Sequence, residues 1–261
     1  MNNLINFKNK NIFITGSSGY LGRALAKKYL KLGANLYLTD LDTKKNKFLY
    51  SLKNKKQKLF LFNCNLEDEK EIFLMTENLK KNFKTIHVMI NNAAVAGTSI
   101  NKGWNVNFLK QSLNGWEKSM KVNLMAIFKI VQSCYVQLNK TNSNIVNIAS
   151  IYGVVGPNYE IYKGTKINNP AAYAVSKSGL IHLTKWLAST LAPKIRVNCI
   201  SPGGILRDQS KKFISQYKKK CPLSKMATEK DVVNSCIFLS SNMSSYVTGH
   251  NLVVDGGWTI I

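Results

Sequence analysis

Short apolar runs alternate with longer stretches of helical periodicity along almost the whole chain. The short runs are nearly continuous in Ile, Val, Leu and Phe, which is typical of strands that are covered on both faces. We predict strands at Asn11–Thr15, Asn35–Thr39, Lys58–Phe62, Ile86–Asn91, Asn144–Ala149, Ile195–Ile200 and Asn251–Val254. The longer stretches predict helices at Tyr20–Leu32, Thr43–Lys53, Glu67–Asn82, Trp116–Leu138, Ala171–Leu191 and Glu229–Ser240.

This alternation of strands and helices predicts an α/β fold. Successive strand–helix–strand units are almost always right-handed and form a parallel sheet with helices on both faces. We therefore expect a Rossmann-type, doubly wound parallel sheet of about seven strands. At 261 residues the chain has the length of one large α/β domain, and no repeat or low-complexity linker divides it. The prediction is a single domain over residues 1–261.

The composition is ordinary for a globular protein, with 45% apolar residues. No stretch approaches the roughly 20 consecutive apolar residues that span a bilayer, and residues 1–10 carry no signal-peptide pattern. The five cysteines are scattered and never in a CxxC spacing, so neither a disulfide framework nor a metal site is predicted. We expect a cytoplasmic protein that makes no membrane contact.

The net charge of +24 is the unusual feature of the chain. It is compatible with binding to nucleic acid, to an acidic membrane or to an anionic substrate. The lysines, however, lie in short runs on many polar faces, and no nucleic-acid reading motif accompanies them. We favour a solvated lysine surface, with a basic nucleic-acid binder as the alternative.

A glycine-rich segment, residues 15–22, joins the first predicted strand to the first predicted helix. Glycines at such a turn let the backbone approach a pyrophosphate, which the positive end of the helix dipole attracts. Asp40 ends the second strand, where a carboxylate accepts hydrogen bonds from ribose hydroxyls and repels a 2′-phosphate. NAD is therefore favoured over NADP as cofactor, although Asp42 could share this role and Lys44 and Lys45 lie close in sequence. The predicted contacts are Gly16, Ser18, Gly19, Tyr20, Leu21, Gly22 and Asp40.

A second group of residues indicates proton chemistry. Tyr173 and Lys177 are four residues apart and thus share a helix face. A tyrosine has a pKa near ~10, and a nearby ammonium favours its phenolate form. Ser150 ends a predicted strand (Ile145–Ser150) and can hydrogen-bond a reacting oxygen, while Asn123 lies on a long predicted helix. Ligands bind at the carboxyl ends of such strands, so these four residues are the candidate catalytic set.

Together these motifs resemble the short-chain dehydrogenase/reductase family over essentially the whole chain. The matching segments are the glycine turn, Asp40, residues 91–94 (NNAA), Asn123, Ser150, Tyr173, Lys177, residues 196–198 (RVN), residues 201–203 (SPG) and residues 254–257 (VDGG). The resemblance implies a NAD(P)-dependent oxidoreductase that interconverts an alcohol and a ketone by hydride transfer. It also implies a homotetramer or homodimer that assembles through the helices at Trp116–Leu138 and Ala171–Leu191.

The resemblance also implies a role for each matching residue. Tyr173 would be the acid/base and Ser150 would orient the substrate oxygen. Lys177 would hold the nicotinamide ribose and tune Tyr173, and Asn123 would support a water-linked proton relay. The further cofactor contacts that it implies are Asn65, Leu66, Asn92, Ala93, Ala94, Tyr173, Lys177, Pro202, Gly203 and Ile205.

On the cofactor side the sequence departs from the family pattern in three places. Gly19 gives the turn a GxxGxxG spacing, which is commoner in extended members that act on nucleotide sugars. Asn65 and Leu66 stand where an acidic residue usually contacts the adenine. Arg207 stands where many relatives have a threonine near the nicotinamide, and it brings a cation to the substrate mouth.

On the substrate side the gap of 23 residues between Ser150 and Tyr173 is longer than in most relatives. The extra segment, roughly residues 157–170, is expected to lie over the mouth of the site. A guanidinium binds phosphate or carboxylate, and tyrosines suit stacking on sugar faces. Residues 153–170 and 201–205 carry a weaker resemblance to oxidoreductases of bacterial surface-glycan and flagellin-modification clusters, which agrees with this. We expect a small, carbohydrate-like, anionic substrate, with Tyr159, Lys163 and Arg207 as candidate contacts.

Two other functions stay open at this point, a nucleotide-sugar epimerase or dehydratase and a catalytically silent NAD-binding scaffold. The chain after Gly203 has only 58 residues, which leaves no room for a sugar-nucleotide domain. Loss of Tyr173 or Lys177 would favour the scaffold, and both are present. The sequence therefore favours the oxidoreductase.

Overall fold

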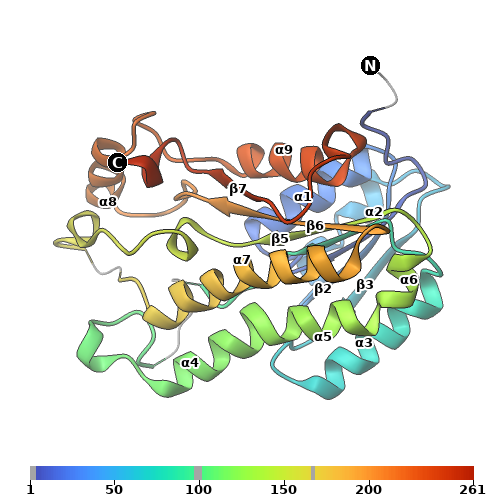
Figure 1. Ribbon diagram of the computed structural model, residues 1–261, viewed down its shortest axis with the longest axis horizontal. Coiled ribbons are helices and arrows are strands. Elements are labelled where there is room, and N and C mark those ends of the chain that lie inside the picture. Colours follow the sequence, from blue (N-terminus) through green and yellow to red (C-terminus); the bar gives the residue numbers. More distant parts are fainter. Residues whose placement is uncertain (1–3, 97–101, 166–167) are drawn as a thin grey trace.

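The computed structural model describes residues 4–96, 102–165 and 168–261. Figure 1 shows the parallel sheet at its centre. The sheet has seven strands in the order β3-β2-β1-β4-β5-β6-β7. These strands are β1 (Asn11–Thr15), β2 (Asn35–Asp40), β3 (Leu59–Asn63), β4 (Val88–Asn91), β5 (Ser143–Ile148), β6 (Ile195–Pro202) and β7 (Asn251–Val254). The predicted Rossmann-type, doubly wound sheet is confirmed. Strands β1 and β4 are neighbours from which the chain proceeds in opposite directions, and ligands bind at such a switch point.

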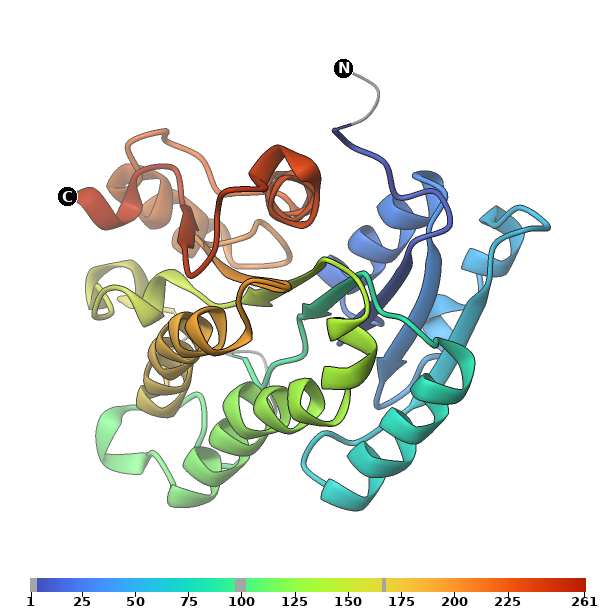
Figure 2. The same cartoon turned by 45° about the vertical axis from the view of Figure 1, so that its right-hand side comes forward.

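Helices cover both faces of the sheet (Figure 2). One face carries α1 (Tyr20–Lys31), α2 (Leu49–Leu52) and α9 (Glu229–Ser240). The other face carries α3 (Glu69–Asn82), α4 (Leu113–Met120), α5 (Ala126–Ser133), α6 (Tyr135–Asn139) and α7 (Ala171–Leu191). The remaining helix of the described chain, α8 (Lys211–Lys220), lies beside the C-terminus in both views.

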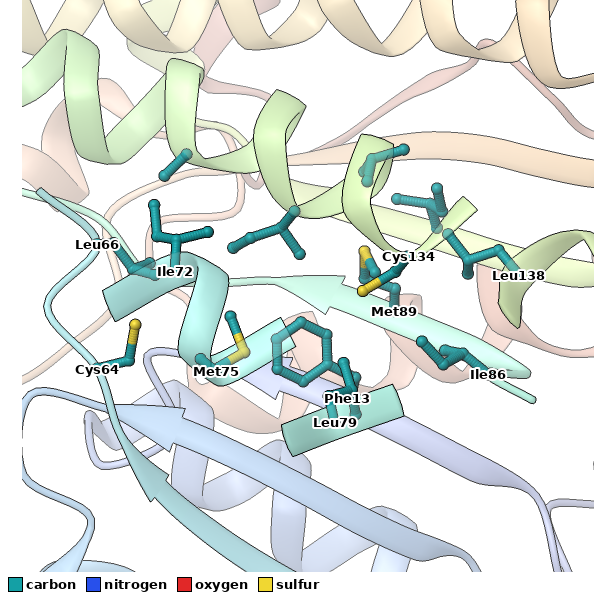
Figure 3. Packing of buried hydrophobic residues seen from close by; sticks show 14 of the residues in the cluster. Phe13, Cys64, Leu66, Ile72, Met75, Leu79, Ile86, Met89, Cys134 and Leu138 are labelled. Carbon is teal, nitrogen blue, oxygen red and sulfur yellow. The ribbon is translucent and has the colours of Figure 1, made fainter. Parts of the chain in front are cut away.

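Two large clusters of buried apolar residues hold these helices to the sheet. Figure 3 shows the first, in which Ile72, Met75 and Leu79 of α3 belong to one cluster with Phe13 and Met89 of the sheet. The three helix residues are three or four positions apart, so their side chains share the face of α3 that turns to the sheet. The second cluster fills the opposite face and joins α1 and α9 to the strands.

A third, smaller apolar cluster lies at one end of the sheet and positions the candidate substrate region. It joins the segment after β5 to α8 and to the C-terminal turn. Helix α8 was not predicted, because half of its ten residues are lysine and only Phe213 and Tyr217, one turn apart, are buried. Ser210 caps this helix, since its Oγ accepts a hydrogen bond from the Phe213 N–H at 3.3 Å.

Two predicted helices differ in form from those observed. The helix predicted at Trp116–Leu138 begins earlier, at Leu113, and is divided into α4, a π-helical turn at Lys121–Met125, α5 and α6. The helix predicted at Thr43–Lys53 is reduced to a 3₁₀ turn at Lys44–Asn46 and the short α2. Periodicity detects the helical phase but not such local changes of winding.

All five cysteines are buried free thiols. No helix in the described ranges is long and apolar enough to cross a membrane. The same residues contain no group of His, Cys, Asp and Glu side chains that could hold a metal ion.

Candidate functional site

The glycine turn after β1 requires two of its glycines for close packing. Gly16 has a φ of +63°, and a Cβ there would lie 2.6 Å from the Ala93 Cα. A Cβ on Gly22 would lie 2.1 Å from the carbonyl oxygen of Gly16, so the first turn of α1 can press against the loop only without a side chain. At Gly19 a Cβ would meet only ordinary contact, 3.5 Å from the Gly16 oxygen. Gly19 lines a cleft, so its missing side chain leaves room for a ligand rather than for protein.

Helix α1 begins at this loop with unsatisfied donors. Gly19 is its N-cap and supplies no side-chain hydrogen bond, and the first turn contains no acidic residue. The first backbone N–H groups of a helix lack partners within the helix, and the helix dipole makes this end positive. The start of α1 therefore has the form of a phosphate site.

Asp40 ends β2 and closes the other side of the glycine loop. Its two carboxylate oxygens accept hydrogen bonds from the backbone N–H groups of Ser18 and Leu41, each at 2.8 Å. Asn46, which is fully buried, donates from Nδ2 to Ser17 Oγ at 2.9 Å and supports the loop from behind. No sequence pattern indicated Asn46, because Ser17, to which it donates, lies 29 residues away along the chain.

The loop after β4 completes the floor of this region. Thr15 Oγ1 accepts hydrogen bonds from the backbone N–H groups of Asn92 and Ala93, both at 3.1 Å. The Asn92 amide in turn donates to the Gly16 carbonyl oxygen at 2.8 Å. The predicted segments at residues 15–22 and 91–94 therefore meet at the switch point of the sheet.

A cleft of about 1160 Å³ lies over these elements. Its lining includes every predicted cofactor contact of the first half of the chain: Gly16, Ser18, Gly19, Tyr20, Leu21, Gly22, Asp40, Asn65, Leu66, Asn92, Ala93 and Ala94. It also includes residues that the sequence did not single out, among them Val95, Lys118, Val122 and Gln209. This lining fits a dinucleotide. The start of α1, which has no side-chain cap, suits the pyrophosphate, and the Asp40 carboxylate suits a ribose.

The candidate catalytic residues lie where β5 ends. The strand stops at Ile148, one residue before the end of the strand predicted at Asn144–Ala149, so Ser150 lies beyond it. Ser150 caps a 3₁₀ turn, and its Oγ accepts a hydrogen bond from the Tyr152 N–H at 3.2 Å. Ser150 also hydrogen-bonds to the Tyr173 phenol. Lys177 is buried and donates from Nζ to the Ile148 carbonyl oxygen at 2.6 Å. The structure therefore brings three of the four predicted catalytic residues together.

Burial dominates the electrostatics of this group. It lowers the pKa of Lys177 to about 8, against a smaller opposing effect of the Cys199 thiol. Burial also raises the pKa of Tyr173, while the hydrogen bond from Ser150 lowers it. The ammonium of Lys177 was expected to favour the phenolate together with a bound nicotinamide ring, and this stays a prediction. The Lys177 Nζ lies 5.9 Å from the centre of the Tyr173 ring, and desolvation of the phenolate outweighs its charge.

Asn123, the fourth predicted catalytic residue, is fully buried in the π-helical turn. Its Oδ1 accepts a hydrogen bond from the Val95 N–H at 2.8 Å, and its Nδ2 donates to the Val95 carbonyl oxygen at 3.1 Å and to Ser176 Oγ at 3.0 Å. The amide side chain thus joins the loop after β4 to α7. In the structure Asn123 hydrogen-bonds to residues around the site, Val95 and Ser176, and not to the other three candidate catalytic residues.

The predicted contacts at the end of β6 and in the turn after it do not line the cleft of the glycine loop; they are Pro202, Gly203 and Ile205. Gly203 packs so closely that a Cβ would lie 2.7 Å from the Tyr217 hydroxyl oxygen. The next residue, Gly204, donates its N–H to that hydroxyl at 2.7 Å. This turn is consequently fixed to α8.

The three candidate substrate contacts separate into two places. Arg207 lines the cleft, where its guanidinium pairs with Glu229 at 3.2 Å and lies 4.5 Å from the centre of the Tyr20 ring. Tyr159 and Lys163 are exposed at the 3₁₀ turn of the inserted segment and do not line that cleft.

The chain is similar to several known proteins over almost its whole length. Residues 17–259 match the family model described as enoyl-(acyl carrier protein) reductase. A short-chain dehydrogenase from Leptospira borgpetersenii, solved with bound NAD+, has 34% sequence identity and a TM-score of 0.85, covering 97% of this chain and 94% of its own. The flagellin modification protein A of Campylobacter coli is 31% identical over 257 residues, 96% of this chain and 98% of that protein. The 3-oxoacyl-(acyl-carrier-protein) reductase of Aquifex aeolicus is 31% identical over 261 residues, 97% of this chain and 98% of that protein.

The match to the family model covers most of the chain, and the relatives share both its length and its fold. The chain therefore belongs to the short-chain dehydrogenase/reductase family, as its sequence predicted, and is a NAD(P)-dependent oxidoreductase that acts on alcohol or keto groups.

Proposed function

We propose that the protein is a NAD-dependent dehydrogenase/reductase, a single domain in which Tyr173 exchanges the proton of the reacting hydroxyl. The observation that supports this most is the grouping of Ser150, Tyr173 and Lys177 at the carboxyl end of β5. A phenol, a hydroxyl beside it and a buried ammonium on the same helix are the parts that proton transfer to an alkoxide or ketone oxygen needs.

In this proposal each residue acts on a stated atom. A bound nicotinamide supplies the hydride acceptor for alcohol oxidation and the hydride donor for ketone reduction. Ser150 Oγ donates a hydrogen bond to the reacting oxygen. Tyr173 takes the hydroxyl proton as phenolate, or returns it as phenol. Because burial raises the pKa of Tyr173, the phenolate depends on the positive charge of Lys177 and of an oxidised nicotinamide ring.

We also propose NAD rather than NADP as the cofactor. Asp40 lines the cleft, and its carboxylate is held in place by two backbone N–H groups. A carboxylate so placed accepts hydrogen bonds from ribose hydroxyls and repels a 2′-phosphate. The Leptospira relative, with 34% identity, was solved with NAD+.

For the substrate we propose a carbohydrate-like, anionic molecule of bacterial surface-glycan synthesis. The flagellin modification protein of Campylobacter coli, 31% identical, supports this assignment. Arg207 lines the cleft and forms an ion pair with Glu229. A guanidinium has five N–H donors, so others remain to bind an anionic group of the substrate. Tyr159 and Lys163 are exposed outside the cleft, so Arg207 is the residue through which an anionic group is best tested.

Tyr173→Phe tests the proposed mechanism. We expect turnover to fall by about 10²–10⁴-fold, the usual contribution of a general acid–base group. Binding of NAD, measured by fluorescence titration, should change little because the ring itself remains. Tyr246→Phe, which alters a fully exposed phenol, is the matched control. Near-normal turnover of the Tyr173 variant with sugars, sugar phosphates and nucleotide sugars would refute the mechanism.

We further propose that the protein forms a homodimer or homotetramer through α5 and α7. Met125, Phe128 and Trp186 expose 54%, 40% and 52% of their surface, and the rings of Phe128 and Trp186 lie 6.4 Å apart. Apolar side chains grouped in this way are typical of an interface. Light scattering of wild type and Trp186→Glu tests this, since the charged variant should dissociate into monomers.

A further inference from the structure

A pair of tyrosines joins the inserted segment to the turn that holds Ser150. The hydroxyl of Tyr152, two residues after Ser150, makes a short hydrogen bond with the hydroxyl of Tyr162. The amide of Asn169, which precedes α7, hydrogen-bonds to both phenols and lowers their pKa values against the rise caused by burial. We call Tyr152, Tyr162 and Asn169 the phenol–amide cluster.

The cluster is held rigidly by aromatic packing. The Tyr162 ring lies 5.7 Å from that of Phe213, which lies 6.2 Å from the Tyr217 ring. Tyr217 stacks on Trp258 with ring centres 4.5 Å apart and planes inclined by 12°. Figure 1 shows why these contacts occur, since α8 and the C-terminal turn lie beside the segment that follows β5. Rigid aromatic neighbours fix the positions of the phenol oxygens.

The hydrogen bonds of the cluster leave unused groups. Asn169 is only 4% exposed, and within residues 4–96, 102–165 and 168–261 its Oδ1 has no hydrogen-bond partner. The two phenols carry two protons, of which one lies in the bond between them. Interchanging the amide N and O would only change which end is unused. A buried polar group without a partner requires an explanation, and a ligand is one.

The unused groups lie close to the candidate catalytic tyrosine. Burial is the main cause that raises the pKa of Tyr162, and a charge on Tyr173 adds to this rise. Asn169 precedes Tyr173 by four residues, and Tyr152 donates its N–H to Ser150 Oγ. The cluster thus flanks both residues that are proposed to contact the reacting oxygen.

We propose that Tyr152, Tyr162 and Asn169 form a subsite that selects substrates carrying a hydroxyl group besides the one that reacts. A hydroxyl both donates and accepts, so it can give its proton to the amide oxygen and accept one from a phenol. The three side chains are neutral, so the subsite suits a hydroxyl group of the substrate better than a charged group. The inference rests on the proposed function, because it specifies the substrate of the same site.

The test compares probes that differ only in hydroxyl groups: cyclohexanol, trans-cyclohexane-1,2-diol and myo-inositol. We expect Tyr162→Phe and Asn169→Ala to lower kcat/KM for the diol and for inositol by about tenfold or more, because a site built to hydrogen-bond a hydroxyl discriminates strongly when that bond is lost. The value for cyclohexanol should stay within about twofold. Asn168→Ala, next in the chain, and Tyr246→Phe, on an exposed phenol, are matched controls.

Calorimetric binding of inositol to the NADH-bound protein separates this inference from the proposed function. Weaker inositol binding by Asn169→Ala than by wild type supports the subsite even if no probe is oxidised, in which case the proposed chemistry fails instead. Equal losses for cyclohexanol and the diol would show that the cluster is only structural, and they would overturn the inference while the chemistry stands. It is also overturned if wild type favours inositol over cyclohexanol neither in turnover nor in binding.

Discussion

We predict that the buried charge of Lys177 lowers the free energy of unfolding of the protein. Its side chain is 2% exposed, and burial lowers its pKa from the ordinary 10.5 to about 8. At roughly 1.4 kcal/mol for each pKa unit, burying the charged form costs about 3 kcal/mol. Replacing Lys177 with Met removes this cost but also removes the hydrogen bond to the Ile148 carbonyl oxygen at 2.6 Å. A hydrogen bond from a charged group contributes about 1.5–3 kcal/mol, so we expect Lys177→Met to raise the free energy of unfolding by roughly 1 kcal/mol.

The pH dependence of this effect has a definite sign. Below about pH 8 the ammonium is charged in both the folded and the unfolded protein, so the full cost is present. Between about pH 8 and 10.5 the folded state loses its proton first, wild type becomes more stable with rising pH, and the advantage of Lys177→Met shrinks. The same variant should lose turnover, because the proposed phenolate would lack its neighbouring cation.

Urea unfolding followed by circular dichroism, at about pH 7 and about pH 10 and at one protein concentration, measures both effects. Lys185→Met is the matched control, since Lys185 is an exposed residue of the same helix. Its free energy of unfolding should stay within about 0.5 kcal/mol of wild type. A Lys177→Met protein that is less stable than wild type at pH 7, or a difference that does not change with pH, would refute the reasoning.

Three further variants test the rest of the site. Asp40→Ala should narrow the preference for NAD over NADP by about tenfold, because the charge opposing a 2′-phosphate is gone; calorimetric titration checks this, and a wild-type preference for NADP contradicts it. Arg207→Ala should raise KM by about tenfold for anionic substrates and leave neutral ones unchanged, and equal KM values in steady-state assays would exclude the contact. Gly22→Ala, whose Cβ would lie 2.1 Å from the Gly16 oxygen, should cost about 1–3 kcal/mol in urea unfolding and weaken NAD binding. Gly156→Ala, where a Cβ meets nothing within 4 Å, should do neither, and similar losses in both variants would disprove the steric argument.

The sequence by itself determined the layered fold and the residues nearest the expected chemistry. Strand and helix periodicities are local properties, so all seven strands were found to within two residues at their starts. The spacing of Tyr173 and Lys177 places both on one helix face whatever surrounds them. The glycine turn follows β1 directly and Asp40 is the last residue of β2, and parallel strands bring their carboxyl ends to one edge of the sheet.

Only the tertiary structure decided which side chains from distant parts of the chain come into contact. Asn123 lies in the π-helical turn, and its side-chain amide hydrogen-bonds to Val95 and Ser176, which lie 28 and 53 residues away along the chain. The direction of the Tyr173 pKa likewise depends on burial, which no spacing reveals. The inserted segment contacts the turn after β5 through the hydrogen bond between Tyr162 and Tyr152. Tyr162 also belongs to one apolar cluster with Phe213 and Tyr217 of α8, a helix that was not predicted. Periodicity is set by neighbours in the chain, whereas burial and pairing depend on residues that the fold alone brings together.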